Sequence, residues 1–65
     1  MCESTIYLLK GSDKTVVMAE AARVFGEGSK VTCINAIGER TIVDDAEIVE
    51  ANLTRHEILL RRREG

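Results

Sequence analysis

Cys2 is the residue of this chain best placed for metal chemistry, because a thiol beside an amino terminus can act as a chelator. The terminal amine of Met1, an adjacent backbone nitrogen and the Cys2 sulfur can close fused five-membered rings around one metal ion. Such a planar set of donors suits Ni(II) or Cu(II), whereas zinc prefers a tetrahedral set. Removal of Met1 would make the amine of Cys2 the terminal donor. Spacing alone also allows the alternative of an incidental exposed thiol.

The other candidate groups favour structural roles. Cys33 lies within the apolar run of residues 31–34, and we expect a small buried hydrophobe rather than a ligand. His56 is the single histidine, and no nucleophile motif accompanies it, so a structural hydrogen bond is preferred over a catalytic base. Asp44 and Asp45 are adjacent and would point to opposite faces of a strand or bond their own backbone in a turn. The sequence therefore predicts a protein that is not an enzyme.

The size of the chain indicates one domain and favours self-association. With 65 residues it forms a single domain, residues 1–65, and a domain of about this size buries only roughly 60% of its unfolded surface. One Cys2 thiolate also supplies too few sulfur donors to close a soft-ligand site. A symmetric homodimer that brings two copies of Cys2 together would complete the site.

Charge and composition argue against nucleic acid and membranes as partners. The net charge is −2, and the only basic cluster is residues 61–63, which we interpret as a solvated carboxyl-terminal tail. Residues 1–9 have neither the charged start nor the apolar run of an export signal, and no segment is long and apolar enough to cross a bilayer. We therefore expect a cytoplasmic protein with both thiols reduced.

The sequence predicts short strands separated by tight turns as the elements that position the candidate residues. Residues 4–9 are rich in β-formers and lead through the turn formers 11–14 into residues 15–18, which predicts a hairpin. A second hairpin is predicted from the strands 30–35 and 40–43, which flank a turn containing Gly38. The glycine-rich residues 26–28 make the tight connection between the two hairpins.

Two stretches are ambiguous between helix and strand. Residues 19–25 are alanine-rich, and residues 44–52 begin with carboxylates and contain good helix formers. Alternation of apolar and polar residues from position 48 and the apolar run 58–60 favour strands. The sequence thus predicts an all-β fold, a small SH3-like barrel of six or seven short antiparallel strands, which would leave few exposed edges.

Three short motifs are the opening Met1-Cys2-Glu3 before an apolar strand, residues 37–39 in a central turn, and residues 56–60 near the end. Together they resemble the CooT family of small nickel-binding accessory proteins linked to maturation of carbon monoxide dehydrogenase. The resemblance covers nearly the whole chain. It implies a cytoplasmic homodimer that holds Ni(II) through Cys2 at or near the dimer interface and that has carbon monoxide dehydrogenase or its other maturation factors as partners.

The resemblance favours a metallochaperone role over bulk storage, because the chain has no histidine-rich tail. His56 is a candidate further ligand, although nothing in the sequence places it near the amino terminus. Two alternatives remain open: a small RNA-binding barrel and a protein-interaction module without a metal role. Scarce stacking aromatics and the negative charge weaken the RNA alternative.

Overall fold

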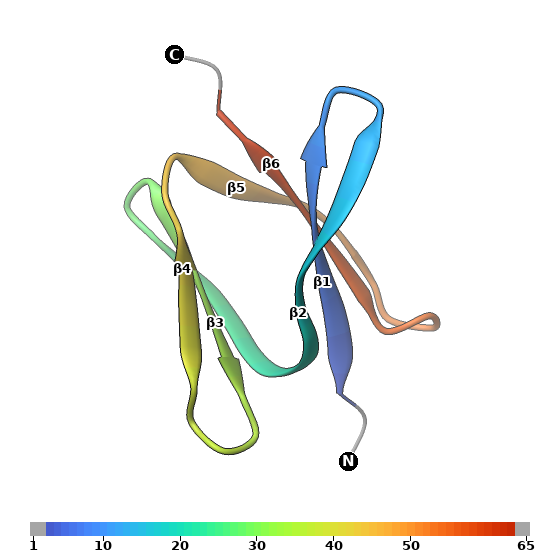
Figure 1. Cartoon of the computed structure of the whole chain (residues 1–65), viewed down its shortest axis with the longest axis vertical. Coiled ribbons are helices and arrows are strands. Elements are labelled where there is room, and N and C mark those ends of the chain that lie inside the picture. Colours follow the sequence, from blue (N-terminus) through green and yellow to red (C-terminus); the bar gives the residue numbers. More distant parts are fainter. Residues whose placement is uncertain (1–2, 64–65) are drawn as a thin grey trace.

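The computed structural model describes residues 3–63, so the proposed ligands Met1 and Cys2 lie outside the described residues. The six strands are β1 (Ser4–Lys10), β2 (Asp13–Glu27), β3 (Lys30–Asn35), β4 (Arg40–Val43), β5 (Ala46–Asn52) and β6 (Glu57–Arg62). They form one sheet that curls into a half-barrel, as the ribbon shows (Figure 1). The predicted all-β, barrel-like fold is confirmed. Residues 3–63 include no helix that could span a membrane.

Glycines stand where two of the predicted turns need a left-handed backbone. Gly11 has a φ of 60° at the turn between β1 and β2, and Gly28 has a φ of 64° at the turn between β2 and β3. Residues with a Cβ avoid this region, and two-residue hairpin turns require it. The local sequence therefore sets both reversals of the chain.

Strand β2 contains the whole ambiguous segment 19–25, which confirms the choice of strand over helix. No break separates that segment from residues 15–18. The register of β2 against β1 instead shifts between Ser4 and Ile6 and again between Ile6 and Tyr7. Such bulges bend a strand and increase its twist. One long strand can therefore pair with β1 over its first part and with β3 over its second.

The order of strands across the sheet is β4-β3-β2-β1-β6-β5, and β1 and β6 run parallel. In this pair Thr5 lies opposite Glu57 and Leu9 opposite Arg61. The prediction of antiparallel strands is wrong here and right for the other four pairs. No hairpin joins β1 to β6. Their relative direction is therefore set by the path of the whole chain and not by a local turn.

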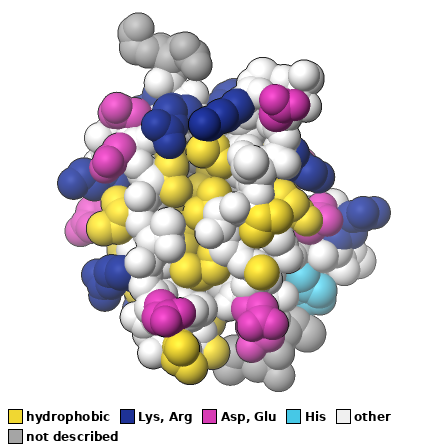
Figure 2. All heavy atoms as spheres, in the orientation of Figure 1, with side chains coloured by type: hydrophobic (Ala, Val, Ile, Leu, Met, Phe, Trp, Pro, Cys, Tyr) yellow, Lys and Arg dark blue, Asp and Glu magenta, His cyan; other side chains and the backbone are white. Residues whose placement is uncertain are grey.

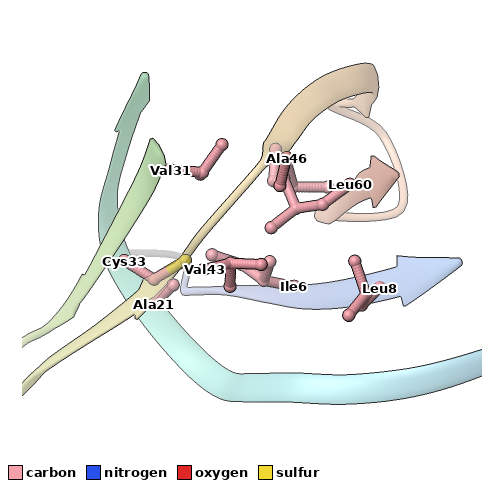
Figure 3. Packing of buried hydrophobic residues seen from close by; sticks show 9 residues of the cluster. Ile6, Leu8, Ala21, Val31, Cys33, Val43, Ala46 and Leu60 are labelled. Atoms are coloured by element: carbon pink, nitrogen blue, oxygen red, sulfur yellow. The ribbon is translucent and has the colours of Figure 1, made fainter. Parts of the chain in front are cut away.

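The hydrophobic core lies on the concave side of the sheet, and Figure 3 shows side chains from both halves of it meeting there. Ile6 and Leu60 come from the parallel pair, and Val31 and Cys33 come from β3; these are the largest fully buried side chains. Complete burial of an aliphatic side chain stabilises a fold by roughly 1.5–3 kcal/mol. This core fixes the position of β1 in the sheet.

Candidate functional site

The residue that follows Cys2 lies at an acidic hollow. Glu3, Glu20, Asn35, Ala36 and Ile37 line this hollow, whose volume is about 110 Å³. These residues come from the entry to β1, the middle of β2, the last residue of β3 and the loop between β3 and β4. Two carboxylates on its wall, with no basic residue among the lining side chains, make this end of β1 favourable for a cation. We call it the acidic hollow.

Asn35 holds the loop that forms one side of the acidic hollow. Its Oδ1 accepts hydrogen bonds from the backbone N–H groups of Ile37 at 3.2 Å and Glu39 at 2.9 Å. Its Nδ2 donates to Oε1 of Glu39 at 2.8 Å. Gly38 takes a φ of 90° within the same loop. The loop is therefore tied down while the side chain of Ile37 stays 80% exposed.

His56 lies beside the start of β1, which the sequence does not reveal. The backbone N–H of Thr5 donates to the carbonyl oxygen of His56 at 2.9 Å. Because Thr5 pairs with Glu57, His56 falls next to Ser4 in the parallel register. The side chain of His56 is exposed, and its φ of 56° ends the turn before β6. Contact between the first and last strands leaves no local sequence signal, so sequence reasoning could not place this histidine.

Cys33 is confirmed as a buried hydrophobe. Its side chain is 0% exposed and belongs to the core cluster. Burial raises the pKa of the Cys33 thiol, and the thiolate is the form that binds metal and attacks electrophiles. In the folded chain this thiol is therefore unsuited to be a nickel ligand.

The carboxylate pair has the turn role that the sequence allowed. Asp44 and Asp45 form the exposed turn between β4 and β5, and Asp45 has a φ of 51°. Within residues 3–63, no three side chains of His, Cys, Asp or Glu are grouped so that they could hold a metal ion.

The arginine cluster lies at the far end of β1 from the acidic hollow. Arg61 and Arg62 line a second hollow, of about 550 Å³, together with Leu9, Lys10 and Gly11. We call it the basic hollow. Parallel pairing of β1 with β6 brings these two segments together. The sequence shows only the arginine cluster, because Lys10 is distant from it along the chain.

The two aromatic rings lie against cations. Nζ of Lys14 is 4.5 Å from the centroid of the Tyr7 ring. Cζ of Arg23 is 5.1 Å from the centroid of the Phe25 ring. Binding of single-stranded RNA relies on open aromatic faces that stack on bases. These contacts therefore weigh against the RNA-binding alternative.

Comparisons with known proteins agree with this fold and extend it to a family. The crystal structure of a putative CooT from Carboxydothermus hydrogenoformans superposes with a TM-score of 0.84 and 22% sequence identity, over 97% of this chain and 100% of that chain. At this identity the likeness establishes the fold. No curated protein matches the sequence. The family model described as CO dehydrogenase accessory protein CooT matches residues 1–61. The chain therefore belongs to the CooT family of CO dehydrogenase accessory proteins.

Proposed function

We propose that this chain binds Ni(II) through Cys2 at the interface of a homodimer and handles nickel in the cytoplasm for maturation of carbon monoxide dehydrogenase. Family membership supplies the accessory role. The observation that carries the nickel proposal is the acidic hollow at the residue next to Cys2. An amine, a backbone nitrogen and a thiolate at the chain start form a chelate suited to Ni(II), and carboxylates nearby favour the bound cation.

The firm attachment of β1 supports this chelation. Strand β1 pairs with β2 on one side and with β6 on the other, beginning at Ser4 and Thr5. A metal site anchored on a fixed strand loses less conformational entropy when it closes around the ion.

His56 is a candidate for an additional donor. Its backbone is hydrogen-bonded to Thr5, and its exposed imidazole is a ligand type that nickel accepts. We expect His56→Gln to weaken nickel binding by about tenfold, since loss of an auxiliary ligand leaves the amino-terminal chelate in place. Cys2→Ser should instead abolish tight binding.

Two exposed apolar side chains favour a dimer that covers the same end of the barrel. Ile37 is 80% exposed beside the acidic hollow, and Leu53 is 77% exposed in the turn that leads to His56. They are the most exposed large hydrophobic side chains within residues 3–63. Burial of each would contribute roughly 1.5–3 kcal/mol to association. A two-fold contact through them would bring the two chain starts together.

Nickel titration tests the site. Ni(II) is added to reduced wild type, to Cys2→Ser and to Cys33→Ala, with absorption and calorimetry as readouts. Wild type and Cys33→Ala should bind tightly and show a thiolate-to-nickel charge-transfer band, and Cys2→Ser should show neither. Equal binding by wild type and Cys2→Ser would reject Cys2 as the ligand. Loss of binding in Cys33→Ala with the fold intact would reject the choice of cysteine.

The mass in solution tests the interface. Size-exclusion chromatography with light scattering should give a dimer for wild type and a monomer for the double variant Ile37→Glu/Leu53→Glu. Val16→Glu is a matched control, because Val16 is also exposed but lies within β2, opposite Tyr7 of β1, and in neither of the loops that carry Ile37 and Leu53. A dimer that survives the double variant would place the interface elsewhere, and a monomeric wild type would reject the homodimer.

A further inference from the structure

The parallel pairing of β1 and β6 creates a cluster of cations that the nickel site does not use. Leu8 pairs with Leu60 and Leu9 with Arg61, so the register continues to Lys10 beside Arg62. Side chains alternate along a strand. Lys10 and Arg62 therefore lie on the same face of the sheet as the buried Leu8 and Leu60. They follow these core residues at the rim of the half-barrel.

Among residues 3–63, carboxylates only partly neutralise this cluster. Arg61 is bonded to Glu47, with 3.4 Å between Nη2 and Oε2. The other ion pair among residues 3–63 lies at the far end of β6. Asp13 faces Lys10 across the hairpin without forming one. Like charges on adjacent strands repel each other. An anionic group placed between Lys10 and Arg62 therefore lowers the free energy of this pair.

The shape of the basic hollow indicates what kind of anion it takes. Its volume of about 550 Å³ is far larger than an inorganic anion needs, and Leu9 and Gly11 contribute an uncharged part of its wall. Figure 2 shows Lys and Arg side chains gathered over hydrophobic ones at one end of the molecule. Apolar surface bordered by cations is complementary to a peptide in which carboxylates alternate with apolar side chains.

We propose that the basic hollow formed by Lys10, Arg61 and Arg62 docks an acidic, partly apolar segment of a protein partner. The site is at the opposite end of β1 from the acidic hollow, so it is separate from the proposed nickel site. A partner held at this surface leaves the amino-terminal end of β1 uncovered. The site accounts for the arginine cluster, which the nickel role leaves without a function.

Fluorescence anisotropy of a labelled peptide in which glutamate and leucine alternate tests the proposal on the full chain. Wild type should bind this peptide, and added salt should weaken binding through screening. The double variant Lys10→Glu/Arg62→Glu should bind about tenfold more weakly. Arg55→Glu is the matched control, because it reverses an exposed charge in the turn at the other end of β6. It should bind as wild type does.

Three results would overturn the proposal. They are equal binding of a peptide with lysine in place of glutamate, an equal loss in Arg55→Glu, and a preference for inorganic phosphate or a single-stranded RNA oligonucleotide over the acidic peptide. Circular dichroism confirms that each variant is folded. Cys2→Ser should bind the peptide as wild type does, which keeps failure of this proposal distinct from failure of the nickel site.

Discussion

Cys33 should be almost unreactive toward thiol reagents in the folded protein, and its residual reactivity should measure opening of the core. In Cys2→Ser it is the only thiol of the chain, so the signal reports on Cys33 alone. Its side chain is 0% exposed and packs within the core cluster. A reagent can therefore reach the sulfur only when β3 separates from its neighbours.

The expected slowing follows from the size of the core. A single core in so small a domain supplies about 3–5 kcal/mol of stability. Each 1.4 kcal/mol is a factor of ten in an equilibrium constant, so the open form is about 10⁻² to 10⁻⁴ of the molecules. An aromatic disulfide reagent should then react roughly two to four orders of magnitude more slowly than it does with unfolded protein.

The assay follows the absorbance of the released thiolate under excess reagent, in buffer and in urea. Adding Leu60→Ala to the Cys2→Ser background should speed the reaction in buffer by tenfold or more, because this variant populates the open form. Reaction of folded protein at the unfolded rate would refute the buried placement of Cys33. If the reaction is slow and Leu60→Ala leaves its rate unchanged, opening of the core does not control the reactivity of Cys33.

Three further outcomes are expected in urea denaturation. Leu60→Ala should lower the free energy of unfolding by about 2–5 kcal/mol through the cavity it leaves, whereas Val16→Ala, at an exposed site outside the proposed interface, should change it by no more than about 1 kcal/mol. The contribution of the Cys33 thiol to the free energy of unfolding should be complete below the unfolded thiol pKa of about 8.5 and should be lost as pH rises through the raised folded pKa. Under alkaline conditions the free energy of unfolding should therefore fall less in Cys33→Ala than in wild type. Gly28→Ala should cost about 1–2 kcal/mol because its φ is 64°, whereas Gly26→Ala, with room for a Cβ and no positive φ, should cost little.

The local features of the fold were predictable because each has a local cause. Alternation at residues 30–35 predicts a strand, and the structure has β3 over Lys30–Asn35. The turn at Gly28 follows from the backbone freedom of glycine. The burial of Cys33 follows from the apolar residues around it. Propensity within a few residues determined each of these features.

The features that join distant segments could not be predicted in the same way. The continuity of β2 through residue 18 depends on bulges against β1, and bulges have no distinct composition. The parallel direction of β6 depends on the path of the whole chain. The parallel pairing of β1 with β6 places His56 beside Ser4, and it also places Lys10 beside Arg62. The candidate site was thus predictable as residue types and not as an arrangement in space.

The same pairing also sets the order in which the domain can mature during synthesis. Strand β1 is made first, yet one of its two neighbours, β6, is made after every other strand of the sheet. A contact between residues so far apart in sequence carries a large loop-closure entropy and forms late and slowly. Strand β1 therefore lacks one of its two neighbours until the last strand of the sheet has been made. The nickel site proposed at the start of β1 would then be completed only after translation.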